Sequence, residues 1–337
     1  MAEKPGLPVS GPAAEHRATL AWQRLGLECR DPKAVEVLRE KRKSAAYRLI
    51  GVGHGGGDVI AKRGTNKIIG IERTVYEQVL ERVAVDKLRY YGSVTEGPDV
   101  AWIFLEQGAG VRWDESVPED CAHAGRWIAQ LHVAAAEAIC TVPLPDLGPR
   151  TQLQRLRDIR STIANSVENV GWSSPHRMVL DGLLAVFDRF EACQARIEEI
   201  CAGAPVTLVH GDLRPKNTRV SEDKSDPYFR AFDWETAGIA APAVDLARVD
   251  ARAYASVVGA AWPHVDLAAV EQLAVVGHLL RNLDAVRWDG TGSLGTPSHQ
   301  DYRIGRLRLY TERIDAGLRE LSRGKAGASH RGLGRSA

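Results

Sequence analysis

The sequence Leu208-Val-His-Gly-Asp-Leu-Arg-Pro-Lys-Asn217, followed by Ala231-Phe-Asp-Trp-Glu235, decides the fold and the chemistry predicted for this chain. The apolar runs at 206–209 and 229–232 predict two short strands, each leading into a loop. We expect the loops to bring Asp212, Asn217 and Asp233 around one small space. There, one carboxylate can orient or deprotonate an acceptor hydroxyl, while an Asn and an Asp can hold Mg²⁺ on nucleotide phosphates. The pattern therefore predicts phosphoryl transfer.

Protein kinases have the same five-residue spacing between a catalytic Asp and a metal-binding Asn, followed by a metal-binding Asp. Here His-Gly-Asp212 takes the place of His-Arg-Asp, and Phe-Asp-Trp-Glu235 that of Asp-Phe-Gly. With these differences, the chain from about Ser44 to Leu321 resembles the aminoglycoside phosphotransferase and choline kinase superfamily, the small-molecule branch of the kinase-like enzymes. The resemblance implies an α+β, bilobal protein-kinase-like fold, with an antiparallel β-sheet N-terminal lobe and a larger, mainly helical C-terminal lobe.

Length and composition agree with a two-lobed enzyme. The chain has 337 residues, 44% of them hydrophobic, and a net charge of +1, which indicates neither a nucleic-acid partner nor a membrane surface. No apolar run reaches the length of a membrane span, and the N-terminus lacks a signal-peptide pattern. The five cysteines are scattered without CxxC pairs, which favours reduced thiols in a cytoplasmic protein.

We expect four segments along the chain. Residues 1–18 and 322–337 have compositions typical of disorder. Residues 19–107 form the nucleotide-binding lobe and end at its hinge, and residues 108–321 form the helical lobe with the catalytic loops and the acceptor site. Within the first lobe, Asp31 and Pro32 predict the start of a helix that covers about 31–40.

Two strands, 46–50 and 59–62, are predicted around Gly51-Val-Gly-His-Gly-Gly-Gly-Asp58. These glycines would allow backbone amides to approach phosphates, although an ordinary hairpin turn has the same composition. Lys62 ends the second strand, as the third-strand lysine of the kinases does. By that resemblance it neutralises the α- and β-phosphates of the nucleotide.

The partner of Lys62 is expected on the helix 71–80, where both Glu72 and Glu77 are candidates. The resemblance favours Glu72. The most hydrophobic strand of the lobe, 100–105, is expected to end at the hinge. In the related enzymes the hinge backbone binds the adenine edge, which implies that Leu105, Glu106, Gln107 and Gly108 contact the base.

The second lobe is expected to be helical over 118–132, 153–167, 176–201 and much of 265–321. His132 is interpreted as a buried structural residue. Trp288 is interpreted as a core residue, with a position in the wall of an acceptor pocket as the alternative. Three roles stay open for Glu235, namely support of the metal, contact with the acceptor, or an ion pair with Lys216 or Arg214. Lys216 is expected to be an exposed loop lysine, with contact to the γ-phosphate as the alternative.

The resemblance implies an enzyme that uses ATP or GTP with Mg²⁺ to phosphorylate a hydroxyl of a small molecule. Asp212 is the predicted base, Asn217 and Asp233 bind the metal, and Lys62 with Glu72 positions the phosphates. The predicted acceptor is an antibiotic or related natural product, and balanced charge argues against a polycationic one. A choline, ethanolamine or metabolite-alcohol kinase is the alternative enzyme, and a catalytically silent kinase-like binding protein is the alternative class.

Overall fold

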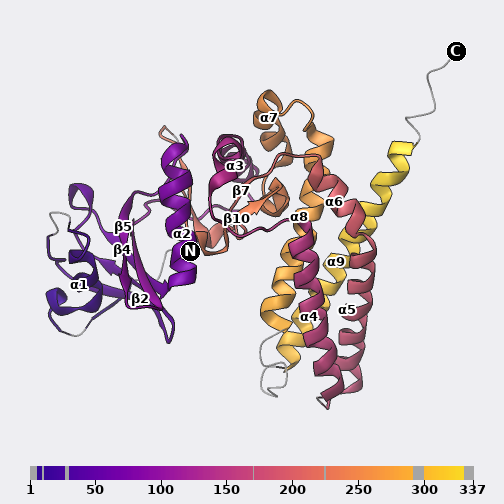
Figure 1. The fold of residues 1–337 in the computed structure, drawn as a ribbon, viewed down its shortest axis with the longest axis horizontal. Helices are drawn as coiled ribbons and strands as arrows, with labels where there is room; N and C mark the ends of the chain where they lie inside the picture. The colour runs from indigo at the N-terminus through magenta and orange to yellow at the C-terminus, as the bar shows by residue number, and fades with distance from the viewer. Residues whose placement is uncertain are drawn as a thin grey trace. The chain divides into compact units, whose positions relative to one another are not determined.

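The computed structural model describes residues 6–9, 11–26, 30–169, 171–223, 225–290 and 300–329 (Figure 1). The chain divides into two compact units. The first contains residues 1–127, 137–144 and 210–237, and the second contains residues 128–136, 145–209 and 238–337. The loops with Asp212, Asn217 and Asp233 therefore lie in the unit that holds the sheet. In the part of the chain that the structure describes, no helix is long and apolar enough to cross a membrane.

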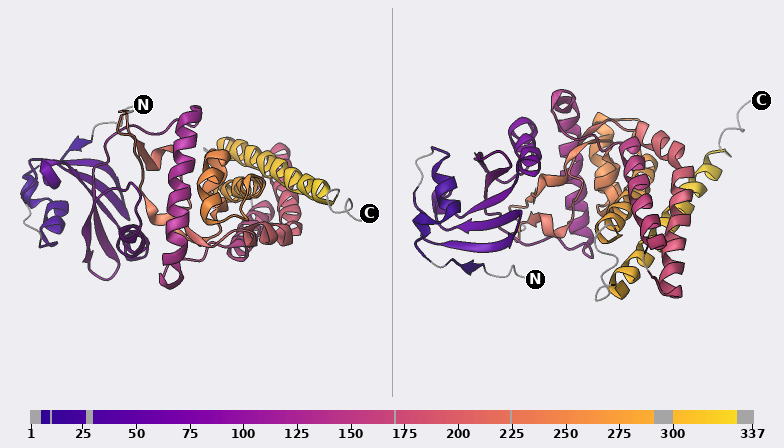
Figure 2. Two further views of the ribbon diagram at one scale, coloured as in Figure 1. Left: turned by 90° about the horizontal axis from the view of Figure 1, so that it is seen from above. Right: turned by 60° about the horizontal axis from the view of Figure 1, so that its bottom comes forward.

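The first unit is built on an antiparallel sheet (Figure 2). The sheet has six strands in the order β1-β2-β3-β4-β6-β5. Its strands are β1 (Leu7–Pro8), β2 (Val35–Lys41), β3 (Ser44–Leu49), β4 (Val59–Thr65), β5 (Tyr90–Glu96) and β6 (Val100–Glu106). Strand β3 shows why these segments are extended, because Ala45, Tyr47 and Leu49 are buried and alternate with more exposed residues. A period of two places one set of side chains on the core face and the other set on the opposite face.

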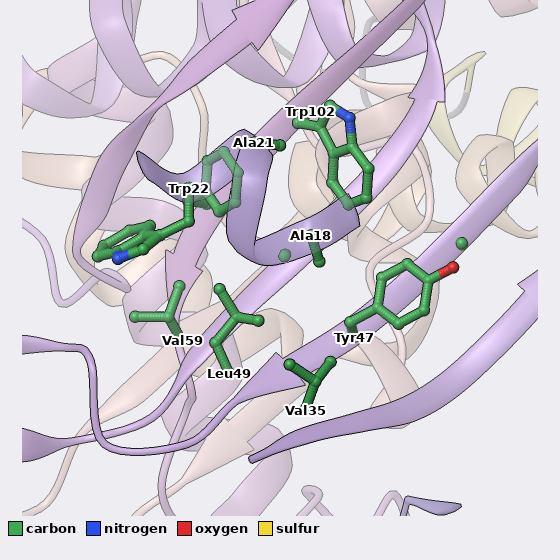
Figure 3. Close-up of a cluster of buried hydrophobic side chains, with 11 residues drawn as sticks. Ala18, Ala21, Trp22, Val35, Tyr47, Leu49, Val59 and Trp102 are labelled. Carbon is green, nitrogen blue, oxygen red and sulfur yellow. The ribbon is translucent and has the colours of Figure 1, made fainter. Parts of the chain in front are cut away.

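The helix α1 (Arg17–Gln23) covers one face of the sheet. Figure 3 shows Ala18 and Trp22 of this helix above Leu49 and Val59 of the strands. The Trp22 ring packs edge-on against Phe104, with 5.4 Å between ring centroids. Because Val59 and Ala61 of β4 belong to this core, the alternation of the strand directs Lys62 to the opposite face.

The sequence prediction was wrong for the segment 31–40. It contains strand β2, which pairs with β3 over Val35–Lys41, instead of a helix. Val35 and Val37 are β-branched and alternate with charged residues, a pattern that outweighs the helix-start signal of Asp31 and Pro32. Of the segment 1–18, for which disorder was expected, the structure describes residues 6–9 and 11–18; there β1 pairs with β2 and Ala18 is fully buried.

Two further elements of the first unit carry functional candidates. Helix α2 (Asn66–Thr74) holds Glu72 and continues into a π-helical turn over Val75–Val79. The strands β8 (Thr218–Val220) and β9 (Phe229–Ala231) form an antiparallel hairpin between Asn217 and Asp233. Phe229 is fully buried, with its ring 5.2 Å from that of Trp127, so the hairpin is anchored by aromatic packing.

The second unit is mainly helical. Its helices are the later part of α3 (Pro118–Ala138), then α4 (Pro149–Asn169), α5 (Ser174–Ala192), α6 (Gln194–Ala202), α7 (Ala251–Ala261), α8 (Leu267–Gly290) and α9 (Gln300–Ser329). The strands β7 (Thr207–Val209) and β10 (Gly238–Ala240) form an antiparallel pair. An antiparallel sheet in one unit and mostly helices in the other confirm the predicted fold class.

The sequence predictions for individual segments of the second unit are partly confirmed and partly wrong. The helix expected over 176–201 is interrupted at Cys193, where φ is −88° and ψ is 0°, and forms α5 and α6. Helix α9 continues to Ser329, beyond the expected end at 321. Trp288 is 70% exposed, with Arg287 over its ring, so its assignment to the core was wrong. His132 is fully buried and bonded to Tyr254, as expected of a structural histidine.

Candidate active site

A glycine shapes the loop that leads to Asp212. Gly211 has a φ of +76°, in the left-handed region that glycine enters without strain. A Cβ at this position would lie 2.4 Å from the carbonyl oxygen of Thr236. The glycine of His-Gly-Asp therefore allows two loops of the first unit to pass in contact immediately before Asp212.

His210 joins the same two loops by hydrogen bonds. Its Nε2 donates to the carbonyl oxygen of Phe232 at 3.0 Å, and its Nδ1 accepts from the amide of Asp212 at 3.2 Å. Thr236 donates its hydroxyl to the carbonyl oxygen of His210 at 3.1 Å. A carbonyl oxygen can only accept and an amide can only donate, so these bonds assign the neutral Nε2–H tautomer. The histidine thus fixes the backbone at both Asp212 and the residue before Asp233.

Asp212 and Asn217 lie at the two ends of the catalytic loop and contact each other. The Asn217 Nδ2 donates to the backbone oxygen of Asp212 at 2.9 Å and to its carboxylate Oδ2 at 3.0 Å. Arg214 donates to the same Oδ2 through Nη2 at 2.7 Å and Nε at 2.9 Å, and the Lys216 ammonium lies 3.6 Å away. Both amide hydrogens of Asn217 are used within the loop, which leaves its side-chain oxygen for another ligand.

Asp233 has an unusual backbone conformation. Its φ is +68°, and within the described ranges it is the only non-glycine residue with a positive φ. Asp tolerates the left-handed region better than most residues, and such strain often marks a functional position. The conformation ends strand β9 and begins the turn Trp234–Thr236.

Lys62 lies opposite Asp233 and connects three carboxylates. Its Nζ donates to Glu72 Oε2 at 2.8 Å, forms a close ion pair with Asp233, and lies 3.5 Å from Glu235 Oε2. Glu72 is fully buried, and its other oxygen accepts the amide of Trp234 at 3.2 Å. Helix α2, strand β4 and the turn after Asp233 are therefore joined through one ammonium group and one carboxylate.

The structure distinguishes the two glutamates that the sequence left open. Glu72 pairs with Lys62, whereas Glu77 is half-exposed and accepts the Tyr90 hydroxyl at 2.6 Å. Glu235 forms its ion pair with Lys62, which was not among the partners predicted for it, and its predicted roles toward the metal or the acceptor stay predictions.

The ion pairs set the charges of this cluster. Burial lowers the pKa of Lys62, but the carboxylates of Glu72, Asp233 and Glu235 outweigh it and raise that pKa above its usual value. Burial raises the pKa of Asp233, and the Lys62 ammonium more than compensates, so that the pKa lies below its usual value. Complete burial raises the pKa of Glu72, and Lys62 opposes this effect. Lys62 is therefore a cation and Asp233 an anion over the ordinary pH range.

Lys62, Glu72 and Asp233 line one cavity of about 350 Å³ in the first unit. All predicted nucleotide and metal residues line it, namely Lys62, Glu72, Leu105, Glu106, Gln107, Gly108, Asn217 and Asp233. Apolar walls come from the side chains of Leu38, Ala46, Ile60, Leu88 and Phe232. Asp212 is not part of the lining and contacts the cavity residue Asn217. The structure thus brings the sequence-predicted residues together.

The backbone amides of the predicted hinge differ in whether they already donate a hydrogen bond. The amide of Glu106 donates to the carbonyl oxygen of Arg89 at 2.8 Å, and that of Gln107 donates to the carbonyl oxygen of Asp58 at 3.0 Å. Among the described residues, the amide of Gly108 has no acceptor. A Cβ on Gly108 would lie 3.2 Å from both Arg219 and Leu88, so a side chain there would crowd the cavity wall.

The nucleotide loop proposed from the sequence does not reach the cavity. In the segment 51–58, Gly53 donates to Gly57 at 2.7 Å and His54 donates to the Tyr91 hydroxyl at 2.9 Å, so these amides are already used. No residue of this segment lines the cavity of Lys62; the β2–β3 hairpin does so through Leu38, Arg39 and Ala46. We missed the hairpin because a helix was expected there, although the alternation of Val35 and Val37 signals a strand.

Comparison with known proteins agrees with this geometry. The model of the phosphotransferase enzyme family (APH) matches residues 73–288, which include the loops with Asp212, Asn217 and Asp233. Comparison with curated protein sequences finds no significant match.

Solved structures share the fold at low sequence identity. An aminoglycoside phosphotransferase from Alicyclobacillus acidocaldarius is 16% identical, with 85% of this chain and 91% of the other covered and a TM-score of 0.54. A mutant of aminoglycoside 2′-phosphotransferase IIIa in complex with GDP is 16% identical, with 91% and 97% covered and a TM-score of 0.56. Spectinomycin phosphotransferase with ADP and spectinomycin is 10% identical, with 88% and 98% covered and a TM-score of 0.51.

At these identities the structural likeness shows the fold alone. The family match covers more than half of the chain. The chain therefore belongs to the phosphotransferase enzyme family and is an enzyme of the small-molecule kinase type.

Proposed function

We propose that the protein transfers the terminal phosphoryl group of ATP or GTP, bound with Mg²⁺, to a hydroxyl of an antibiotic or related natural product. The main support is the position of Lys62, which contacts Glu72 and Asp233 in a cavity that Asn217 also lines. Asp212 contacts Asn217 at the edge of this set. A cation for phosphates, two oxygen ligands and a base are thus close together, as phosphoryl transfer requires.

The donor base is expected between the apolar side chains of the cavity, with its edge toward the hinge. The amide of Gly108 can donate to the base, because within the described residues it has no other acceptor. Lys62 would then contact the α- and β-phosphates. Its position is fixed by Glu72, whose carboxylate is itself held by the amide of Trp234.

Asn217 and Asp233 would hold Mg²⁺. The side-chain oxygen of Asn217 suits this role because both of its amide hydrogens already donate to Asp212. The described residues include no group of three or more His, Cys, Asp and Glu side chains that could hold a metal alone. In such enzymes Mg²⁺ takes most of its ligands from phosphates and water. When bound, the ion would neutralise charge on the phosphate oxygens.

In the proposed reaction, Asp212 orients the acceptor hydroxyl and takes its proton. The hydroxyl oxygen forms a bond to the γ-phosphorus as the bond from this phosphorus to the β–γ bridging oxygen breaks, which releases a nucleoside diphosphate. The residues contribute alignment and charge neutralisation more than covalent chemistry. The Asn217 amide and the His210 ring would limit the movement of Asp212 during this step.

Charge around the base favours an acceptor that is neutral or anionic. The guanidinium of Arg214 lies 2.7 Å from the Asp212 carboxylate, and the ammonium of Lys216 lies 3.6 Å from it. A polycationic aminoglycoside or a quaternary amine such as choline would approach two cations at this point. A glycosylated or nucleoside-like antibiotic fits the same site without this repulsion.

The test is release of ADP and GDP by the purified protein with Mg²⁺ over a panel of antibiotics, amino alcohols and sugars. The panel should include neutral, anionic and polycationic antibiotics, and Asp212→Asn serves as the blank. We expect turnover with a neutral or anionic natural product. Preference for a polycation or for choline would contradict the charge argument, and absence of both turnover and nucleotide binding would favour the silent binding protein.

A further inference from the structure

The β2–β3 hairpin brings a second cation to the nucleotide cavity. Strand register pairs Arg39 of β2 with Ala46 of β3, and Ala46 with Lys62 of β4. Directly paired residues of antiparallel strands point to the same face, so Arg39 and Lys62 share the cavity face. All three residues line the cavity. The methyl side chain of Ala46 leaves space between the two cations.

A β-bulge explains how Arg39 reaches the cavity. The register shifts between Val37 and Arg39, which adds Leu38 as an extra residue on this strand. Both Leu38 and Arg39 consequently line the cavity. Arg39 is exposed, and its hydrogen bond to the Ser44 hydroxyl is long, at 3.4 Å. Its guanidinium group is therefore available to a ligand.

The turn of the hairpin presents side chains and does not contain a glycine-rich loop. Lys41 pairs with Ser44, and the two residues between them are Arg42 and Lys43. None of these four residues is a glycine, and none has a positive φ. The acidic residue of the turn region, Glu40, lies on the opposite face and pairs with Arg17.

We propose that Arg39 is a phosphate-binding residue that holds the terminal phosphates of the donor together with Lys62. Neighbouring strands are about 4.8 Å apart, so two strand steps separate the Arg39 and Lys62 backbones by about 10 Å. Long side chains on both can then contact one triphosphate. The planar guanidinium suits bidentate contact with phosphate oxygens. This inference rests on the proposed nucleotide-binding function, and it adds a residue that determines preference for the triphosphate.

The test compares the dissociation constants of ATP, ADP and AMP, with Mg²⁺, for the wild type, Arg39→Ala, Arg39→Lys and Arg42→Ala. Arg42→Ala removes the same charge from the same hairpin but outside the cavity lining. We expect Arg39→Ala to weaken ATP binding by about ten- to a hundredfold, the usual range for a lost charged hydrogen bond. The loss should be smaller for ADP and below about twofold for AMP, with partial recovery in Arg39→Lys.

Three outcomes would overturn the proposal in distinguishable ways. Equal ATP affinity in Arg39→Ala and Arg42→Ala would show that Arg39 acts only as a distant charge. An equal loss for ATP, ADP and AMP in Arg39→Ala would indicate damage to the hairpin, and thermal unfolding of each variant would confirm this. Absence of ATP binding by the wild type would overturn the proposed function itself.

Discussion

Substitution of Gly211 by Ala separates backbone strain from steric contact in the catalytic loop. Gly211 has a φ of +76° and a Cβ there would lie 2.4 Å from the Thr236 carbonyl oxygen. Gly97, in the exposed turn between β5 and β6, has a φ of +73° with no atom within 4 Å of an added Cβ. The left-handed conformation should cost alanine about 1–2 kcal/mol at either position. Gly97→Ala is therefore a control matched in backbone conformation.

The difference between the two variants measures the contact with Thr236. Forced contacts in packed regions cost about 1–3 kcal/mol, so we expect Gly211→Ala to lose about 2 kcal/mol more free energy of unfolding than Gly97→Ala in urea titrations. The loop would also have to shift, which displaces Asp212. A displacement of about 1 Å can cost a hundredfold in rate, so kcat/KM should fall by at least about that factor in Gly211→Ala alone. Equal stability and activity in the two variants would refute this reasoning.

Further predictions concern the cluster around Lys62. Asp233→Asn retains a side chain that tolerates the left-handed backbone but removes the charge. ATP affinity measured by calorimetry should therefore lose most of its dependence on the Mg²⁺ concentration. An unchanged dependence would exclude a metal-binding role for Asp233. Glu72→Gln should lower the free energy of unfolding by about 1–3 kcal/mol in denaturant titrations, because it breaks a buried ion pair while the Trp234 amide keeps an acceptor. The control Glu77→Gln, at a half-exposed ion pair, should change this free energy by less than about 0.5 kcal/mol. Lys62→Met removes the cation that opposes the burial-raised pKa of Glu72. The folded variant then binds more protons than the unfolded chain, so its stability should rise as the pH falls from 8 to 5, and a flat profile would contradict this.

The grouping of the site residues could be predicted from the sequence because it depends on short, local patterns. The spacing from Asp212 to Asn217 and the strand before Asp233 are enough to predict adjacent carboxylate and amide groups. Lys62 followed by a helix with Glu72 is a second local pattern, and the structure places both patterns at one cavity. The fold class followed from the same motifs through their resemblance to a known superfamily.

Long-range pairing explains what the sequence did not reveal. The segment 31–40 becomes a strand because β3 pairs with it, and no local signal states which partner is available. In the segment 51–58 the amide of Gly53 donates within its own loop, and the amide of His54 donates to the hydroxyl of Tyr91, 37 residues away in the chain. The choice between Glu72 and Glu77 likewise depends on where helix α2 lies against the turn after Asp233. Burial and register decide these features.

The rate of Mg²⁺-dependent ADP release by Asp212→Asn, measured beside the wild type with the best acceptor of the panel, tests the central claim most directly. The substitution keeps the shape of the residue that binds Asn217 but removes the base. A lost general base costs about 10²- to 10⁴-fold in rate, so we expect turnover to fall by this factor while Mg·ATP affinity stays within about twofold. Turnover equal to that of the wild type would contradict the assignment of Asp212 as the base and with it the proposed mechanism.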